Sequence, residues 1–180
     1  PAMNVKTIAD KKNIIKSKEN AFELEMDVTP ASMATTGIEL YNAKGEKVNI
    51  YFDMKEKKLV MDRTESGLIE FGKLAVPHDI EKNYADIHQG VGNTPFRVFN
   101  SINYKNDFAL GTWAPLSLCE GKTYHVDIFV DKCSVEIFVD GGRIAMTNLV
   151  FPTTPYTSVK FYNKGASSSF RNIKISELSL

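Results

Sequence analysis

The chain has 180 residues and carries 22 basic and 22 acidic side chains, so its formal net charge is zero. A balanced charge excludes a strongly basic nucleic-acid-binding protein and a polybasic membrane anchor, because both need clustered lysine and arginine. No apolar run approaches the roughly 20 residues that a membrane-spanning helix requires. We therefore expect neither a nucleic-acid partner nor a membrane partner.

The residue types that bind metals are few and scattered. Cys119 and Cys133 do not form a CxxC pair, and His78, His88 and His125 are spread along the chain. Structural zinc sites need ligands at characteristic close spacings, so we expect no metal and no cofactor. Two cysteines are too few for a disulfide scaffold. We expect free thiols, with a disulfide between the two cysteines as the alternative.

The N-terminal segment shows no secretion signal, because residues 1–20 are polar and lysine-rich without an apolar stretch. Residues 1–3 resemble a remnant of cloning, so localisation is not read from this end. We divide the chain into a connecting segment, residues 1–19, and one domain, residues 20–180.

Alternating polarity dominates the first part of this domain. In residues 20–28, four apolar side chains alternate with three acidic ones. Unbroken alternation predicts a strand with one buried face, and Pro30 ends it because proline cannot donate a ladder hydrogen bond. The sequence also predicts shorter strands at residues 37–41, 48–52 and 59–61.

The middle of the chain breaks this rhythm. Residues 74–107 contain two prolines, two glycines and scattered aromatic side chains. Such a stretch is typical of a long excursion from one domain rather than of a second domain. Within it, residues 79–89 are expected to form one short helical turn.

The C-terminal third predicts five strands, of which the first three form a meander: residues 124–130, 133–139, 144–151, 158–162 and 170–178. We place Cys133 on the apolar row of the second strand. Phe129 and Phe138 fall on the opposite, polar face. Gly141 and Gly142 mark the turn into the third strand, because glycine tolerates positive φ without steric cost.

Together these patterns define the fold class. Many short alternating strands with little sign of helix predict an all-β protein. Strands with one polar and one apolar face favour two stacked antiparallel sheets over a buried parallel sheet. We therefore expect a two-sheet antiparallel β-sandwich.

Three segments carry a resemblance to a known family: residues 62–67 (DRTESG), 128–142 (IFVDKCSVEIFVDGG) and 151–152 (FP). In this order they resemble the C-terminal β-sandwich of glycoside hydrolase family 32, which contains invertases, levanases and inulinases. Residues 114–116 (APL) also fit the family pattern. The resemblance covers most of the chain, from residue 20 onward.

The resemblance implies a lectin-like fold, a concanavalin-like jelly roll of two sheets. Ten motif residues are expected to have structural roles in it: Asp62, Arg63, Ser66, Gly67, Asp131, Ser134, Glu136, Phe138, Phe151 and Pro152. Two features depart from the family pattern. Cys133 stands where a small residue is usual, and the connection between residues 67 and 107 is longer than usual.

The resemblance also implies what this sequence lacks. Family enzymes cleave fructosyl bonds with a retaining pair of carboxylates about 5 Å apart, and an N-terminal five-bladed propeller holds that pair. The Trp-Met-Asn-Asp-Pro-like, Arg-Asp-Pro and Glu-Cys segments of the propeller do not occur here: Trp113 precedes Ala114, and Glu120 follows Cys119. We therefore expect no catalytic residues in this chain, and we expect residues 1–19 to include the connection to a propeller.

Two groups of charged side chains are candidates for chemistry. Asp127 and Glu136 lie on the polar face of adjacent predicted strands, where they form either a cross-strand acid–base pair or part of a solvated surface. Arg63 either grips a sugar hydroxyl or carboxylate, or pairs with a neighbouring acid and pins the turn at Gly67.

Aromatic side chains in and beside the excursion are candidates for sugar binding, because flat rings bury sugar C–H faces at little entropic cost. We name Trp113 and Tyr104 as stacking residues and Asn103 as the amide that binds hydroxyl groups. Phe129 and Phe138 either form a second sugar platform or pack against a partner.

The sequence therefore predicts a non-catalytic module of a fructan- or sucrose-cleaving glycosidase. Its expected partner is the propeller of the same polypeptide, which it would brace while shaping the substrate groove or mediating a homodimer. The alternative is an autonomous carbohydrate-binding module that binds a fructan oligosaccharide. Because fructan polymers are too large to enter cells intact, we expect the parent enzyme to be secreted or periplasmic.

Overall fold

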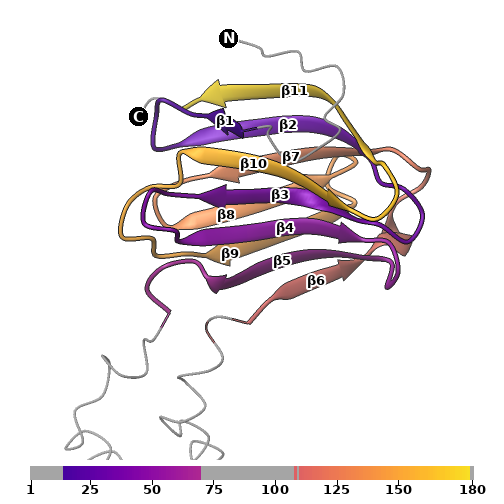
Figure 1. Cartoon of the computed structure of the whole chain (residues 1–180), viewed down its shortest axis with the longest axis horizontal. Helices are drawn as coiled ribbons and strands as arrows, with labels where there is room; N and C mark the ends of the chain where they lie inside the picture. The colour runs from indigo at the N-terminus through magenta and orange to yellow at the C-terminus, as the bar shows by residue number, and fades with distance from the viewer. Residues whose placement is uncertain (1–13, 70–107, 109, 179–180) are drawn as a thin grey trace, which may run out of the picture.

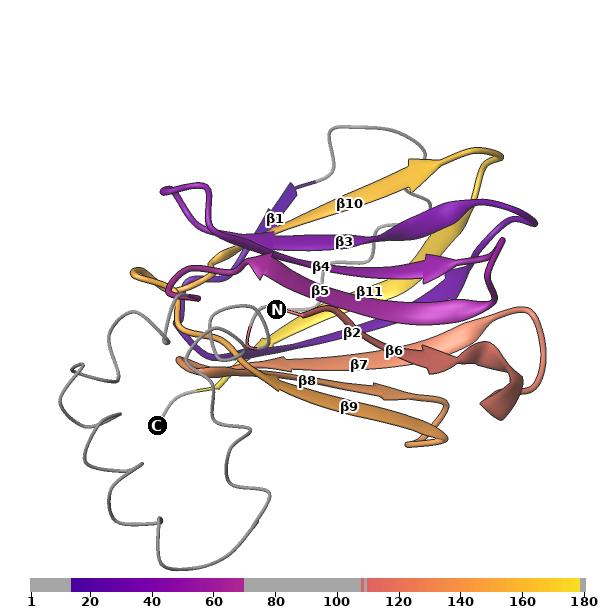
Figure 2. The same ribbon diagram turned by 90° about the horizontal axis from the view of Figure 1, so that it is seen from below.

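Two antiparallel β-sheets stacked face to face form the structure (Figure 1). The computed structural model describes residues 14–69, 108 and 110–178. Viewed from below, β3, β4 and β5 lie in one layer, and β2, β7 and β8 lie in the other (Figure 2). The predicted two-sheet antiparallel β-sandwich is confirmed. Within the described residues, no helix has the length and apolar character needed to cross a membrane.

The first sheet has six strands in the order β1-β10-β3-β4-β5-β6. Its strands are β1 (Ile14–Lys16), β10 (Ser158–Lys164), β3 (Thr35–Tyr41), β4 (Lys47–Asp53), β5 (Lys58–Glu65) and β6 (Thr112–Pro115). A short 3-10 helix, η2 (Leu116–Leu118), follows β6. β5 and β6 are antiparallel neighbours, with Met61 opposite Thr112. The two ends of the long excursion therefore leave the sheet at the same edge.

The second sheet has five strands in the order β11-β2-β7-β8-β9. Its strands are β11 (Ser169–Glu177), β2 (Phe22–Thr29), β7 (Tyr124–Val130), β8 (Ser134–Val139) and β9 (Ile144–Leu149). The predicted meander is confirmed as β7, β8 and β9. β2 pairs with β7, which lies much later in the sequence, and this pairing brings two alternating polar rows side by side.

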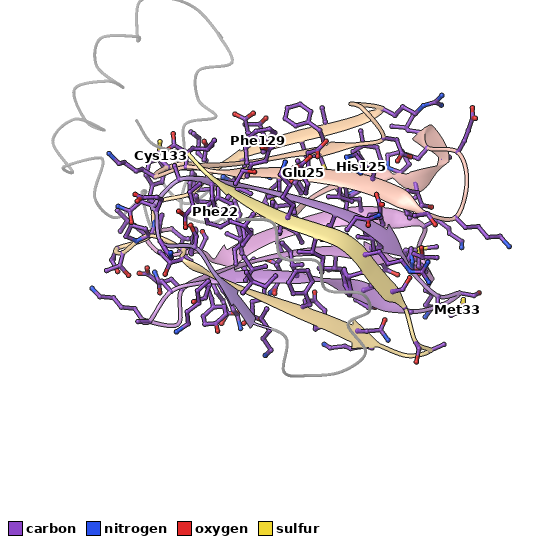
Figure 3. The ribbon with its side chains drawn as sticks, turned by 90° about the horizontal axis from the view of Figure 1, so that it is seen from above. Phe22, Glu25, Met33, His125, Phe129 and Cys133 are labelled. Carbon is purple, nitrogen blue, oxygen red and sulfur yellow. The ribbon has the colours of Figure 1, made fainter. Side chains whose placement is uncertain are left out.

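The core follows directly from the alternation of side chains along each strand. In β2, Phe22, Leu24, Met26 and Val28 are buried, and the acidic residues between them are half-buried. β7 and β8 alternate in the same way. The apolar rows of the two sheets face each other and form one contiguous core. Phe22, labelled in Figure 3, is fully buried in this core.

Some local expectations differ from the structure. β1 and β6 are not predicted, and β5 continues through four polar residues to Glu65. The placement of Cys133 on the apolar row is wrong, because it is exposed and lies in the turn before β8 begins. Cys119 and Cys133 are both free thiols. The helical turn expected at residues 79–89 lies outside the described residues, as does the excursion at 74–107.

Candidate functional site

The outer face of the five-stranded sheet carries four ionisable side chains that we call the β2–β7 cluster: Glu25, Asp27, His125 and Asp127. The register of β2 and β7 sets Glu25 opposite Asp127 and Asp27 opposite His125. His125 Nδ1 is 2.8 Å from Asp27 Oδ1, and its Nε2 is 3.3 Å from Asp127 Oδ1. The imidazole therefore lies between two carboxylates. Figure 3 labels Glu25 and His125, which lie near each other.

Two side chains from β11 hold the β2–β7 cluster in place. Asn172 Nδ2 donates a hydrogen bond of 2.6 Å to Asp27 Oδ2, and Lys174 Nζ lies 2.6 Å from Glu25 Oε2. The pairing of β11 with β2 is irregular just before Lys174, and Asn172 has a φ of 52°. Such a bulge re-aims side chains, and here it brings an amide onto a carboxylate of the next strand.

Electrostatics within the cluster favour a protonated imidazole. The hydrogen bond to Asp27 raises the pKa of His125 against the effect of burial, and the charge of Asp127 raises it further. Burial raises the pKa of Asp27, but the hydrogen bonds that its carboxylate accepts outweigh burial and leave this pKa below its ordinary value. Burial and the neighbouring carboxylates raise the pKa of Glu23, the next acidic residue along β2. This face of the sheet therefore concentrates negative charge.

A hollow of about 260 Å³ lies beside the turn that joins β7 to β8. Phe129 and three motif residues, Asp131, Ser134 and Glu136, contribute to its lining. The ring of Phe129 contacts the ring of Phe138 edge to face, with centroids 5.9 Å apart. An aromatic ring beside carboxylate and hydroxyl groups is the combination of side chains that binds sugars.

The register of β7 and β8 decides between the two alternatives for Asp127 and Glu136. Asp127 lies opposite Phe138, and Glu136 lies opposite Phe129. The two carboxylates are therefore diagonal neighbours rather than directly opposed, which favours a solvated surface over a cross-strand acid–base pair. They belong to the polar outer face, as the other alternative proposed.

The three predicted sugar-binding residues do not gather at this hollow. Trp113 lies on β6, at an edge of the other sheet, and its side chain is 57 % exposed. Lys58 Nζ lies 4.2 Å from the centroid of its ring, in cation–π geometry. Tyr104 and Asn103 lie outside the described residues.

Arg63 ties separate stretches of backbone together at one end of the sandwich. Its Nη1 donates to the Leu149 carbonyl oxygen (2.7 Å) and its Nε to the Leu110 carbonyl oxygen (3.4 Å). The guanidinium carbon lies 4.4 Å from the ring centroid of Phe108, and burial lowers the pKa of Arg63. The neighbouring Asp62 accepts two hydrogen bonds from the residue two positions onward. Within the described residues, the acceptors of Arg63 are thus carbonyl groups, and its pairing with an acid stays a prediction.

Ser66 and Gly67 close the same end against the connection from β9 to β10. Gly67 has a φ of 129°, and a Cβ atom there would lie 2.5 Å from the Phe151 carbonyl oxygen and 2.7 Å from Pro152 Cα. The buried Tyr156 hydroxyl donates to the Ser66 carbonyl oxygen. The motif residues at 66, 67, 151 and 152 are thus packed together although they are far apart in sequence.

Three exposed leucines, which we call the leucine rim, have backbone groups that are hydrogen-bonded at this end. Leu68, Leu110 and Leu149 are 41 %, 56 % and 52 % exposed. The backbone at each of them is fixed: the Leu68 N–H donates to the Phe151 carbonyl, and Arg63 donates to the other two carbonyls. Clustered exposed apolar side chains are typical of docking surfaces, whereas scattered single ones are not.

The two stacked antiparallel sheets form a β-sandwich of the lectin type. The structure is similar to that of the Caenorhabditis elegans galectin LEC-6, with a TM-score of 0.58 and 10 % identity, covering 97 % of this chain and 96 % of that chain. It is also similar to the crystal structure of exo-inulinase from Aspergillus awamori, with a TM-score of 0.68 and 20 % identity. That similarity covers 99 % of this chain and 29 % of the exo-inulinase. Both similarities concern the fold, and they confirm its lectin-like character.

Sequence comparison then identifies the family. Residues 2–177 match the family described as "Glycosyl hydrolases family 32 C terminal", and the chain belongs to this family. A levanase of Bacillus sp. (strain L7) is 22 % identical over 165 residues, which cover 91 % of this chain and 14 % of the levanase. The chain spans between 14 % and 19 % of the length of the curated levanases that it matches. The family predicted from the three motif segments is confirmed.

Proposed function

We propose that this chain is a non-catalytic module that braces the catalytic module of a fructan-cleaving glycosidase. Its family is the C-terminal domain of glycosyl hydrolases family 32, and the protein from Bacillus sp. (strain L7) that it resembles is named a levanase. The small share of that levanase's length leaves room for a separate catalytic module. The observation that carries the proposal is the leucine rim, an apolar surface whose backbone is held in place.

The leucine rim suits a permanent contact inside one polypeptide. Interfaces between domains of one chain bury roughly 600–1,500 Å², and exposed apolar patches mark such contacts. Arg63 keeps Leu110 and Leu149 at fixed positions through their carbonyl groups, so docking would require little further ordering. Preorganisation of this kind strengthens association because less side-chain and backbone entropy is lost.

The carboxylates of the described sheets support a non-catalytic role. A retaining glycosidase needs a nucleophile and an acid/base carboxylate that flank the scissile bond about 5 Å apart. Glu25 and Asp127 do oppose each other, but Lys174 already pairs with Glu25 and His125 lies against Asp127. We therefore expect the purified chain to release no fructose from levan, inulin or sucrose. Fructose release by the pure chain would contradict the proposal.

A matched pair of substitutions tests the bracing surface in the parent polypeptide. Leu149→Glu places a charge in the leucine rim, whereas Leu118→Glu changes an equally exposed leucine on η2 (52 % and 51 % exposed). We expect Leu149→Glu to shorten the half-life of fructan hydrolysis at elevated temperature and Leu118→Glu to leave it unchanged. Equal half-lives for both variants, or a gene that encodes no catalytic module upstream, would overturn the proposal.

The hollow at Phe129 favours a second candidate function, binding of a fructan oligosaccharide by the sandwich itself. Affinity gel electrophoresis through levan and inulin, with a cellulose derivative as the control polymer, measures it directly. Retardation by fructans that is lost in Phe129→Ala would support this candidate, and loss in Trp113→Ala would place the site at the predicted residue instead. Absence of retardation would remove this candidate. Shaping of the substrate groove and formation of a homodimer stay predictions.

A further inference from the structure

We propose that Glu25, His125 and Asp127 form a binding site for a zinc ion on the outer face of the five-stranded sheet. Each of these residues offers one ligand atom, and the three atoms lie within 4.8 Å of one another. Zinc held at about 2.1 Å by nitrogen and oxygen ligands separates them by about 3.4 Å in tetrahedral geometry. Small rotations of exposed or half-buried side chains would close the difference.

The three ligands lie on interior strands of this sheet. β2 and β7 are both interior strands, since β2 lies between β11 and β7, and β7 lies between β2 and β8. Glu25 is directly opposite Asp127, and His125 is two residues from Asp127 on the same face. Sites built on paired strands hold their ligands more precisely than sites on loops. The sequence does not predict this site, because its ligands are about a hundred residues apart and only the pairing of β2 with β7 joins them.

A second shell of hydrogen bonds orients the imidazole as metal sites require. Metal-binding histidines almost always donate their other ring N–H to a carboxylate or carbonyl, which fixes the tautomer. Here His125 Nδ1 is 2.8 Å from Asp27 Oδ1, and Asn172 in turn donates to Asp27 Oδ2 at 2.6 Å. Nε2 therefore points toward Asp127 as the available ligand atom. Asp27 is not one of the three ligands, so its carboxylate can hold the His125 ring in place while the ring binds the ion.

The charges around the site also favour a bound cation. Like charges directly opposite each other on adjacent strands destabilise a sheet, and Glu25 opposes Asp127. Among the described residues, Lys174 is the lysine or arginine within ion-pair distance of this group, and it contacts Glu25 Oε2. Lys174 contacts one oxygen of Glu25, and His125 is the partner of Asp127, so a second cation would find two carboxylates there.

The imidazole favours zinc over the hard divalent cations. Zinc binds histidine nitrogen and carboxylate oxygen and can keep a fourth position for water beside three protein ligands, whereas calcium needs six to eight oxygen ligands. His125 is exposed, so an ion can enter from solvent. A bound ion would join β2 to β7 and stabilise the folded sheet, because ligands that bind only the folded state raise stability.

Isothermal titration of the metal-free chain with zinc chloride tests the proposal. We expect saturable 1:1 binding and a rise in the melting temperature when zinc is present. His125→Ala should abolish binding, and Asp27→Ala should weaken it 10- to 100-fold, as loss of a second-shell partner does. Glu39→Gln is the matched control, since it removes a half-buried carboxylate from β3 in the other sheet, and it should leave the affinity unchanged.

Two further measurements support the titration: cobalt binding reports on the ligands, and unfolding curves report whether each variant is folded. Co²⁺ bound at the site should give visible absorption that Asp127→Asn abolishes, and metal-free unfolding curves show that each variant is folded. Zinc affinity that is unchanged in His125→Ala would place any binding elsewhere and overturn the proposal. Failure to saturate with millimolar zinc would also overturn it, and so would calcium binding that His125→Ala leaves intact.

Discussion

The two longer family motifs of this protein lie in regions of contrasting structure. Residues 62–67 are packed against Phe151 so closely that Gly67 has no room for a Cβ atom. The motif around β8 ends at Asp140, Gly141 and Gly142, where a Cβ atom on either glycine would meet nothing within 4 Å. The first region is closely packed at Ser66 and Gly67, although Thr64 and Glu65 are exposed, and the second presents its polar side chains on an open face.

Two motifs of the same family can therefore have different structural roles. In the closely packed region, a motif residue is fixed by steric contact and backbone hydrogen bonds, so its role is folding and positioning. In the open region, Glu136 and Phe138 lie on an outer strand face, and only the alternating valines and isoleucine beneath them are buried. Substitutions in the two regions should therefore differ in how much stability they remove.

The largest effect is expected for Gly67→Ala. A β-carbon at φ 129° would be strained and would collide with the Phe151 carbonyl oxygen, which together cost about 3 kcal/mol or more. Urea unfolding monitored by fluorescence measures the loss. A loss below 1 kcal/mol would mean that the two strands can move apart and that this end is not closely packed.

Arg63→Ala should have the next largest effect. It removes two hydrogen bonds from a charged donor and the contact with Phe108, worth about 2 kcal/mol in total. Arg63→Lys should recover less than half of that, because one ammonium group cannot reproduce the planar donor arrangement of a guanidinium. Complete recovery by lysine would show that charge alone matters here. The same unfolding experiment reports both variants.

Glu46→Gln should change how stability depends on pH. Glu46 accepts hydrogen bonds from Asn42 and from the Thr153 backbone and hydroxyl. Burial raises its pKa, but these bonds outweigh burial and leave the pKa below its ordinary value of 4.5. Its stabilising contribution, about 1–2 kcal/mol, is thus present above pH 4.5 and is lost as the pH falls through the lower pKa of the folded protein. The variant should be less stable at pH 7 and lose less on acidification, as measured by thermal unfolding between pH 7 and pH 3. Parallel pH profiles would contradict this.

The smallest effects are expected in the open region. Gly142→Ala meets no neighbouring atom and bears only the strain of φ 93°, about 1 kcal/mol. Glu136→Gln on the polar face should stay within about 0.5 kcal/mol, as surface substitutions do. A loss from Glu136→Gln as large as that from Arg63→Ala would erase the contrast between the two motifs. The unfolding midpoints of these variants in urea measure the losses of stability.

The sequence predicts the strands that have one buried and one solvated face, but it does not predict β1 and β6. β2, β7 and β8 follow a strict alternation, so their periodicity predicts both the strand and its buried face. β6 is an edge strand without a buried row, and β1 has three residues; neither has a pattern to detect. Residues 62–65 are polar and were not predicted as strand, because pairing with β4 overrides their local preference. The division at residues 19 and 20 stays a prediction.

The candidate sites show the same limit. The acidic residues of β2 marked an outer face in the sequence, but nothing local indicates that β2 lies beside β7. Only that register brings His125 to Asp27. Likewise, Arg63 was recognised as a motif residue, but its carbonyl partners belong to Leu110 and Leu149, whose positions depend on the packing of both sheets. Long-range pairing is the information that alternation does not contain.

The pairing of β5 with β6 affects how the length of this protein can vary. Its two strands pair side by side, and Arg63 fixes the Leu110 carbonyl beside β5, so the two points where the intervening chain leaves and returns are held together by the sandwich itself. Closing a loop between fixed ends costs only about 0.6 kcal/mol for each doubling of its length. The sandwich therefore tolerates insertions at this edge. The segment between β5 and β6 can change in length and sequence during evolution while the packing of the core stays the same.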